Sequence, residues 1–214
     1  DTTEHNVYQP LKSHEAGRPA GSNIGWTTGF WPGMLWLAYE LTKDERYRHA
    51  GEHHIRSFAD RIARRIDVDH HDLGFLYTPT CIAPWRLPGN EDGKRAALQA
   101  AQQLMARYWE KPGIFQAWGR MDDPEQRGRT IVDSLMNMPL LYWASEATAD
   151  GRYRAAAERH TRQLRDHFVR ADNTTFHTFY FDADTGKPRF GKTAQGSGDN
   201  SCWARGQAWA MYGF

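Results

Sequence analysis

Apolar and polar positions along the chain form pairs of segments, in which an apolar stretch, a short polar turn and an amphipathic stretch follow one another. One pair covers residues 34–40 and 42–54, and another covers residues 140–146 and 148–160. An aspartate stands in each turn where a helix N-cap is expected, and apolar residues recur at helical spacing after it. The pattern predicts two helical hairpins.

The second hairpin repeats the first one at a distance of 106 residues. Between residues 42–54 and residues 148–160, Thr, Asp, Arg, Tyr, Arg, Ala, Glu and His recur in register. Self-similarity of this kind is typical of stacked supersecondary units. We therefore expect a fold that is built from successive hairpins.

Further helices are predicted between and after these two hairpins. Residues 73–87 and 91–110 form another candidate pair, and an apolar helix is expected from near Trp203 to the last residue. Pro79 and Pro84 fall within the first segment of this pair, where a proline removes a backbone hydrogen bond and kinks a helix. We therefore expect a kinked helix over residues 73–87.

Few segments have a strand-like pattern. Short strands are predicted at residues 114–118 and 176–181, and a turn is predicted at residues 182–186. Helical hairpins of about 50 residues can stack as an open solenoid or close as a ring of six, which needs well over about 300 residues. The chain supplies about three and a half hairpins, so we interpret it as an all-α part of a longer chain.

Charge and apolar content exclude several classes of function. The 214 residues include 27 Lys+Arg against 26 Asp+Glu, so no basic excess is available and no nucleic-acid partner is expected. The longest uncharged apolar stretch, residues 29–39, is too short to span a bilayer, so no membrane partner is expected. Two cysteines cannot form a disulfide framework, and we expect a cytoplasmic protein.

Aromatic side chains are abundant in this polar chain, with 9 Trp, 9 Tyr and 10 Phe. Flat rings stack on sugars, but they are also routine material for a protein core. Composition alone leaves both interpretations open.

Two aspartates stand where inner helices begin, and they are the candidate acids. Asp133 lies among apolar neighbours at the start of a helix, and Asp72 occupies the same place on the preceding hairpin. Each of them alone is explained as a helix N-cap, but their equivalent positions favour a site. His70 and His71 precede Asp72, but no third ligand follows at a suitable spacing, so neither a metal site nor a cofactor is predicted.

Aromatic and polar residues cluster at the corresponding ends of the other hairpins. They are Trp26, Phe30 and Trp31 in the first hairpin, Trp118 before the second aspartate, and His177 in the late strand. A glycine-containing loop also brings Gln195, Trp203 and Arg205 together along the chain. This loop suits a sugar acid, because arginine binds carboxylates with two hydrogen bonds and tryptophan faces stack on sugar rings.

Five segments carry distinctive motifs. They are Trp-Thr-Thr-Gly-Phe-Trp-Pro-Gly at 26–33, His-His-Asp-Leu-Gly-Phe at 70–75, Ile-Val-Asp-Ser-Leu-Met-Asn-Met-Pro-Leu-Leu at 131–141, Phe-His-Thr-Phe-Tyr-Phe at 176–181 and Trp-Ala-Arg-Gly-Gln-Ala-Trp at 203–209. Together they resemble the unsaturated glucuronyl hydrolases, glycoside hydrolase family 88. The resemblance implies an (α/α)6 toroid, with residues 26–214 as a partial catalytic domain after an extended or loop segment at residues 1–25.

The resemblance also implies an activity on oligosaccharides that contain an unsaturated uronate, which polysaccharide lyases leave behind. A family member removes this uronic acid from the non-reducing end by hydrating its C4=C5 enol ether. Asp133 would give a proton to C4 and take one from the water that adds at C5, while Asp72 would hold and polarise the reacting groups.

The remaining pocket residues follow from the same resemblance. His177, Gln195, Trp203 and Arg205 would line the pocket, with Trp26, Phe30, His71, Trp118 and Trp209 around the sugar rings.

Two alternative functions stay open. One is an unsaturated rhamnogalacturonyl hydrolase, although the motifs at 70–75 and 136–141 favour the glucuronyl family. The other is a saccharide-binding toroid without catalysis, against which the retention of both aspartates speaks.

Overall fold

A computed structural model describes residues 2–4, 7–9 and 23–214. The chain divides into two compact units, one of Asp1–Val68 with Asp72–Ala101 and one of Asp69–His71 with Gln102–Phe214. The segment predicted at residues 1–25 lies largely outside the described residues, so that prediction stays untested. Among the described residues, no helix combines the length and the hydropathy needed to cross a bilayer.

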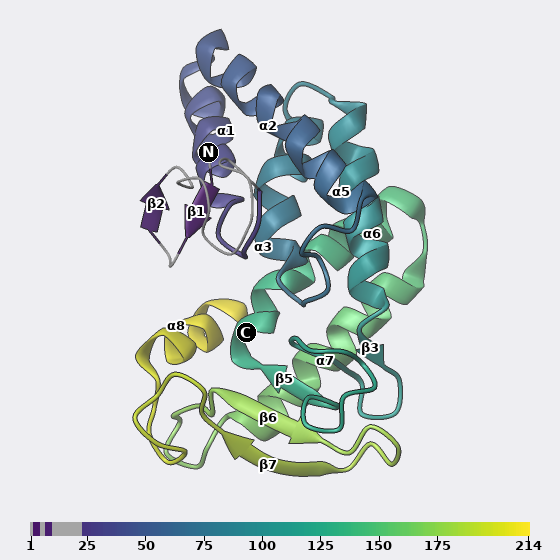
Figure 1. Cartoon of the computed structure of the whole chain (residues 1–214), viewed down its shortest axis with the longest axis vertical. Helices are drawn as coiled ribbons and strands as arrows, with labels where there is room; N and C mark the ends of the chain where they lie inside the picture. The colour runs from purple at the N-terminus through teal and green to yellow at the C-terminus, as the bar shows by residue number, and fades with distance from the viewer. Residues whose placement is uncertain (1, 5–6, 10–22) are drawn as a thin grey trace. The chain divides into compact units, whose positions relative to one another are not determined.

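The first unit contains the first predicted hairpin, formed by α1 (Phe30–Thr42) and α2 (Glu45–Ala63) (Figure 1). The Asp44 carboxylate accepts the backbone N–H of Arg46 at 2.9 Å, as the pattern predicted for a helix N-cap. A short antiparallel pair, β1 (Thr2–Glu4) and β2 (Val7–Gln9), precedes the hairpin.

The next helix of this unit is interrupted, as its prolines predicted. It consists of α3 (Leu73–Tyr77), a π-helical turn η2 (Thr78–Ile82) and α4 (Ala83–Arg86). Pro79 lies in the π turn, where the regular i to i−4 bonding of an α-helix is already broken. The helix α5 (Glu91–Met105) follows.

The prediction of a helix over residues 91–110 was wrong at its end, because α5 stops at Met105. The chain then forms β3 (Tyr108–Trp109), which pairs with β4 (Ile114–Phe115) in antiparallel fashion. Gly113 has φ +70°, a conformation that favours glycine and lets the chain reverse there. This β-hairpin also shortens the strand that we expected at residues 114–118.

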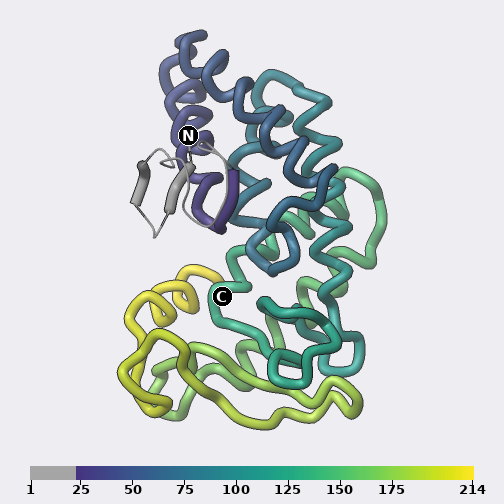
Figure 2. Tube along the Cα trace, viewed as in Figure 1, coloured from purple at the N-terminus to yellow at the C-terminus, as the bar shows by residue number. Residues whose placement is uncertain are grey.

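The second unit contains a three-stranded antiparallel sheet in the order β5–β6–β7. Its strands are β5 (Arg129–Ile131), β6 (Thr178–Phe181) and β7 (Pro188–Lys192), and Figure 2 shows β6 and β7 as a hairpin. The predicted strand at 176–181 is β6, and the predicted turn follows it, with the Asp182 carboxylate accepting the Thr185 N–H at 2.8 Å. The pattern did not predict β5 or β7.

The second predicted hairpin lies in the same unit. After β5 comes a 3-10 turn, η3 (Val132–Asn137), which leads into α6 (Met138–Thr148), α7 (Gly151–Phe168) and, after the sheet, α8 (Ala204–Gly213). A buried apolar cluster joins η3, α7 and the sheet. Its members are Ile114, Ala117, Ile131, Val132, Leu135, Leu164, Phe168, Phe179, Phe181 and Ala210.

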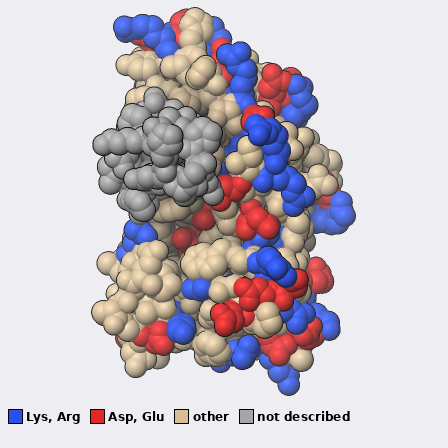
Figure 3. Space-filling view, viewed as in Figure 1, with Lys and Arg blue, Asp and Glu red and all other residues tan. Residues whose placement is uncertain are grey.

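Surface charge is mixed on the face that Figure 3 shows, where Lys and Arg side chains are interspersed with Asp and Glu. This distribution agrees with the formal net charge of +1. Exposed ion pairs contribute little to the free energy of unfolding. The hairpins are therefore stabilised mainly by the packing of their buried faces.

Candidate functional site

Asp133 lies in the first turn of η3, directly after β5. It is not the N-cap of that turn, which is Ile131. The backbone N–H of Val132 donates to the His177 carbonyl at 3.1 Å, so the residue before Asp133 is fixed to the strand segment beside it. The Asp133 side chain is 18% exposed, which leaves the carboxylate within reach of a bound molecule. The sequence prediction of a helix-start acid among apolar neighbours is therefore confirmed.

His71 lies beside this acid in the second unit. Its Nε2 lies 3.5 Å from Asp133 Oδ1, and its side chain is only 1% exposed. The His71 backbone N–H donates to the Ala117 carbonyl at 2.8 Å, which fixes the residue beside the second unit's sheet. The predicted role of His71 near a sugar ring stays a prediction, and the structure adds that its ring lies beside the candidate acid.

Asp72 directly follows His71 in the chain and stands at the N-cap position of α3. Its side chain does not accept a capping hydrogen bond from that helix, unlike Asp44 in α2. The simple explanation of Asp72 as a helix cap is therefore not supported. A role for Asp72 on the same substrate as Asp133 stays a prediction.

Four residues that the sequence assigned to one pocket meet in the second unit. The rings of His177 and Trp203 lie 4.1 Å apart between centroids, and the Arg205 guanidinium lies 4.4 Å from the Trp203 ring centroid. Arg205 Nη2 donates to Gln195 Oε1 at 2.6 Å. An aromatic face, an arginine and an amide are thus grouped as a sugar acid would require.

His177 is held as a neutral imidazole in this group. Burial lowers its pKa to about 4, with smaller contributions from the positive charges of Arg129 and Arg205. Its Nδ1 accepts the backbone N–H groups of Ala194 and Gln195 at 2.9 and 3.2 Å, so the ring proton belongs on Nε2. His177 can therefore donate a hydrogen bond from Nε2, but it is not an acid at neutral pH.

Arg129 is a residue that the sequence analysis missed. Its guanidinium lies 4.3 Å from the ring centroid of Trp118, one of the predicted sugar-binding residues, and the residue is only 9% exposed. Its Nε atom is buried without a hydrogen-bond partner, and burial lowers its pKa. It stands two residues before the 131–141 motif, which gave no signal for a role, and its contact with Trp118 depends on the fold.

The other predicted aromatic residues are divided between the two units. In the first unit, Trp26 packs against Phe30 and Phe75, with ring centroids 6.1 and 5.2 Å away. Phe30 is 41% exposed. In the second unit, Trp209 lies on α8 and is half-buried. The clustering of Trp26 with Phe30 agrees with the sequence prediction, and the roles of these residues on a sugar stay predictions.

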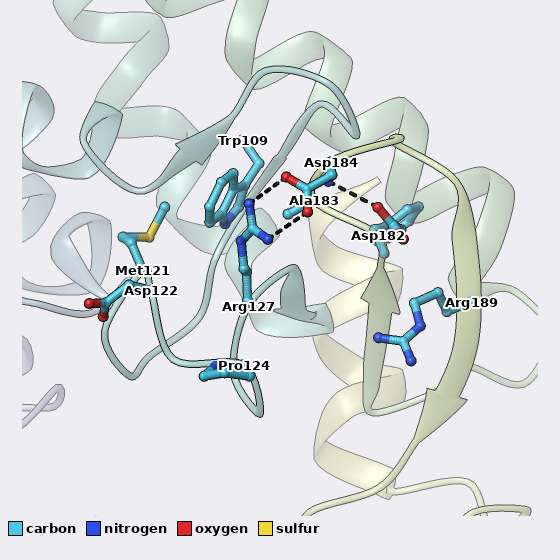
Figure 4. Close-up of a pocket in the computed structure, with 10 residues that line it drawn as sticks. Trp109, Met121, Asp122, Pro124, Arg127, Asp182, Ala183, Asp184 and Arg189 are labelled. Atoms are coloured by element: carbon cyan, nitrogen blue, oxygen red, sulfur yellow. Dashed lines mark hydrogen bonds and ion pairs between the residues drawn. The ribbon is translucent and has the colours of Figure 1, made fainter.

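A separate cavity of about 590 Å³ lies in the second unit (Figure 4). Its lining residues do not include Asp133. Arg127 donates to both carboxylate oxygens of Asp184, at 2.7 and 2.6 Å, and stacks over Trp109. Because these charged groups already bind one another, we assign no catalytic role to this cavity.

Within the second unit, His71 and Asp133 offer atom types that metal ions bind, and the expectation that no metal is bound stays a prediction. His71 and Asp133 offer one nitrogen and one oxygen, which is fewer than the three or four protein ligands that zinc sites use.

Comparison with known proteins gives a consistent result. The model of Glycosyl Hydrolase Family 88 matches residues 3–214. An unsaturated glucuronyl hydrolase of Bacillus sp. (strain GL1) is 48% identical over 192 residues, covering 90% of this chain and 51% of the relative. An unsaturated chondroitin disaccharide hydrolase of Streptococcus agalactiae serotype III (strain NEM316) is 49% identical over 211 residues, covering 99% of this chain and 50% of the relative.

Solved structures agree with these matches. The crystal structure of the unsaturated glucuronyl hydrolase from Bacillus sp. GL1, described as responsible for the degradation of glycosaminoglycan, has a TM-score of 0.88 at 47% identity. The match covers 91% of this chain and 52% of that one. The chain thus spans about half the length of the relatives it matches. The predicted fold class, an all-α (α/α)6 toroid with short β-hairpins, is confirmed for the part that the chain supplies.

Proposed function

Because the chain belongs to glycoside hydrolase family 88, we propose that the protein carrying it releases an unsaturated uronic acid from the non-reducing end of lyase-generated oligosaccharides. The observation that carries this proposal is the contact of 3.5 Å between Asp133 and the buried His71, on a turn that is hydrogen-bonded to His177. Relatives named for unsaturated glucuronyl and chondroitin disaccharide substrates support glycosaminoglycan fragments as the substrate class.

The reaction that suits one acid of this kind is hydration of the C4=C5 enol ether. Asp133 in its protonated form gives a proton to C4, and the resulting carboxylate then takes a proton from the water that adds at C5. The C5 hemiketal opens, the glycosidic bond breaks and the remaining saccharide leaves with its hydroxyl. An ordinary glycosidase would need two carboxylates that flank the glycosidic bond.

Binding of the uronate is assigned to the group around Trp203. Arg205 can form two parallel hydrogen bonds with the substrate carboxylate, and the Trp203 and Trp118 faces can stack on sugar rings. Neutral His177 donates from Nε2 to a sugar hydroxyl, and Gln195 holds Arg205 in place. We further propose that Asp72 polarises the reacting groups and that Trp26, Phe30 and Trp209 contact the sugars. A cytoplasmic location stays a prediction.

The test uses the ultraviolet absorbance of the conjugated C4=C5 double bond. Purified protein is mixed with an unsaturated chondroitin disaccharide, and the absorbance is expected to fall as the free sugar appears. A saturated glucuronide serves as the control, because it has no enol ether and is expected to remain intact. Persistent absorbance with a folded protein that binds the disaccharide would instead support a saccharide-binding toroid without catalysis.

The neighbouring unsaturated rhamnogalacturonyl hydrolases use similar chemistry, so substrate choice separates the two families. We expect faster turnover of an unsaturated glucuronyl disaccharide than of an unsaturated galacturonyl-rhamnose disaccharide. The reverse order of kcat/KM would favour the rhamnogalacturonyl alternative.

A further inference from the structure

His160 is a buried histidine on α7 that the mechanism above does not use. It is fully inaccessible to solvent, and its ring packs edge-on against Phe115 with centroids 5.2 Å apart. Both of its ring nitrogens are within hydrogen-bond distance of partners. Nδ1 lies 3.2 Å from the Phe115 backbone nitrogen, and Nε2 lies 2.7 Å from Ser134 Oγ. Ser134 is the residue that follows Asp133.

The partners of His160 define its protonation. The Phe115 N–H can only donate, so Nδ1 accepts and carries no proton. Ser134 Oγ donates its own proton to the Ile131 carbonyl at 2.6 Å, so it must accept from His160 Nε2–H. A neutral imidazole satisfies both bonds, whereas an imidazolium would lose the bond from Phe115. Burial lowers the pKa of His160 to about 3, with a smaller contribution from His71, which agrees with this assignment.

The same short segment also holds the histidine that contacts Asp133. Phe115 binds His160 through its N–H, and two residues later the Ala117 carbonyl accepts the His71 N–H. The Ala117 N–H donates to the Arg129 carbonyl at 2.9 Å, at the start of the strand that leads to Asp133. The acid and its two histidines are therefore attached to one backbone segment.

We propose that His160 is a positioning residue, which fixes η3 through Ser134 and so sets the direction of the Asp133 carboxylate toward the substrate. This inference rests on the proposed function for its kinetic consequence. A buried hydrogen-bonded network of this kind gives a single arrangement of the turn, and a displacement of about 1 Å in a reacting group can cost up to about 10²-fold in rate.

Two substitutions separate the bonds that His160 makes. In His160→Gln, the side-chain amide can still donate to Ser134 Oγ from the position of Nε2. In His160→Asn, the shorter amide can accept from Phe115 but does not reach Ser134. The residue at the same place in the first hairpin is His54, so His54→Asn is the matched control.

We expect His160→Asn to lower kcat about tenfold or more and to change KM less than about threefold. His160→Gln is expected to recover most of the lost kcat, and His54→Asn is expected to keep it. Kinetics are measured well below the Tm of each variant. Equal losses in the Asn and Gln variants, or a folded His160→Asn with normal kcat, would overturn the proposal.

Amide hydrogen exchange across residues 131–137 provides a readout that does not depend on turnover. Exchange there is expected to be faster in His160→Asn than in the wild type or His160→Gln. If the wild type does not consume the unsaturated disaccharide, the proposed function fails, while this exchange measurement still tests the anchoring. Unchanged exchange in His160→Asn would refute the anchoring alone.

Discussion

The hairpins α1–α2 and α6–α7 have the same loop but different beginnings. In the loops, the Asp44 and Asp150 carboxylates accept the N–H groups of Arg46 and Arg152 at 2.9 and 3.0 Å. The residue before each aspartate has a positive φ, 56° at Lys43 and 60° at Ala149. The shared loop sequence therefore produces the same local geometry in both units.

The two hairpins differ in the residues that come just before the first helix of each. Thr28 and Ser134 are equivalent in the repeat, and both have buried hydroxyl groups. Thr28 Oγ accepts from Arg61 at 3.2 Å, whereas Ser134 Oγ is bound to His160. The preceding residues are Thr27 and Asp133. The same scaffold therefore anchors a hydroxyl in both hairpins, but only the second hairpin has an acid beside it.

The largest effect is expected from removing that acid. Asp133→Asn should lower kcat at least about 10²-fold with substrate binding largely intact, because the amide cannot transfer a proton. Thr27→Val, at the equivalent place in the first hairpin, should change kcat far less. Steady-state kinetics and binding measurements on both variants check this. Near-normal turnover by Asp133→Asn would remove Asp133 from the acid/base role.

Packing between the two helices of each hairpin provides the second prediction. Gly51 of α2 corresponds to Ala157 of α7, but a Cβ at Gly51 would lie 2.7 Å from the Trp36 ring. Gly51→Ala should therefore destabilise the protein by about 1–3 kcal/mol through overpacking. Urea denaturation measures this free energy. Gly151→Ala is the control, since a Cβ there meets no atom within 4 Å, and equal stability of both variants would contradict the packing argument.

Protonation of buried histidines provides the third prediction. The pKa of His160 is about 3 in the folded protein and 6.5 in its ordinary state, so unfolding takes up a proton when the pH lies between these values. His160 therefore contributes stability above its ordinary pKa, and this contribution is lost as the pH falls. Removing the imidazole should reduce the pH slope of the unfolding free energy by up to about 1.4 kcal/mol per pH unit.

Urea titrations of the wild type and His160→Asn from about pH 6 to pH 5 measure this slope. The first hairpin gives the comparison, because burial lowers the pKa of its equivalent His54 to about 4. As the pH falls, the stability lost through each histidine should level off near its folded pKa. This level is reached at a higher pH for His54 than for His160. Identical slopes in the wild type and His160→Asn would show that His160 is not held neutral.

The smallest effects on stability are expected from substitutions in the loops that join the two helices of each hairpin, because these loops are alike. Asp44→Ala and Asp150→Ala each remove an N-cap, and each should lower Tm by about a few degrees. Because the two caps have the same geometry, the two shifts should be similar. Thermal unfolding of both variants measures the two shifts. A lower Tm in only one variant would contradict the equivalence of the two caps.

Much of the helical architecture was predictable because it depends on short-range signals. Capping by Asp44 and Asp150, and interruption of a helix around Pro79, follow from residues within one or two turns of one another. The helix predicted to continue to residue 110 was wrong, since pairing of β3 with β4 outweighs local helical spacing. Strand β5 was missed because its partner β6 is distant in the chain, and β7 was missed although it pairs with the neighbouring β6.

The sequence by itself determined the repeated hairpins, the family and the choice of Asp133 as an acid, because caps, helical periodicity and motifs are written in neighbouring residues. Only the tertiary structure decided that His71 contacts this acid, that Arg129 lies on Trp118, and that His160 holds Ser134. These contacts join residues that are 11 to 62 positions apart, and such distances are closed only when the apolar faces of helices and sheet pack together.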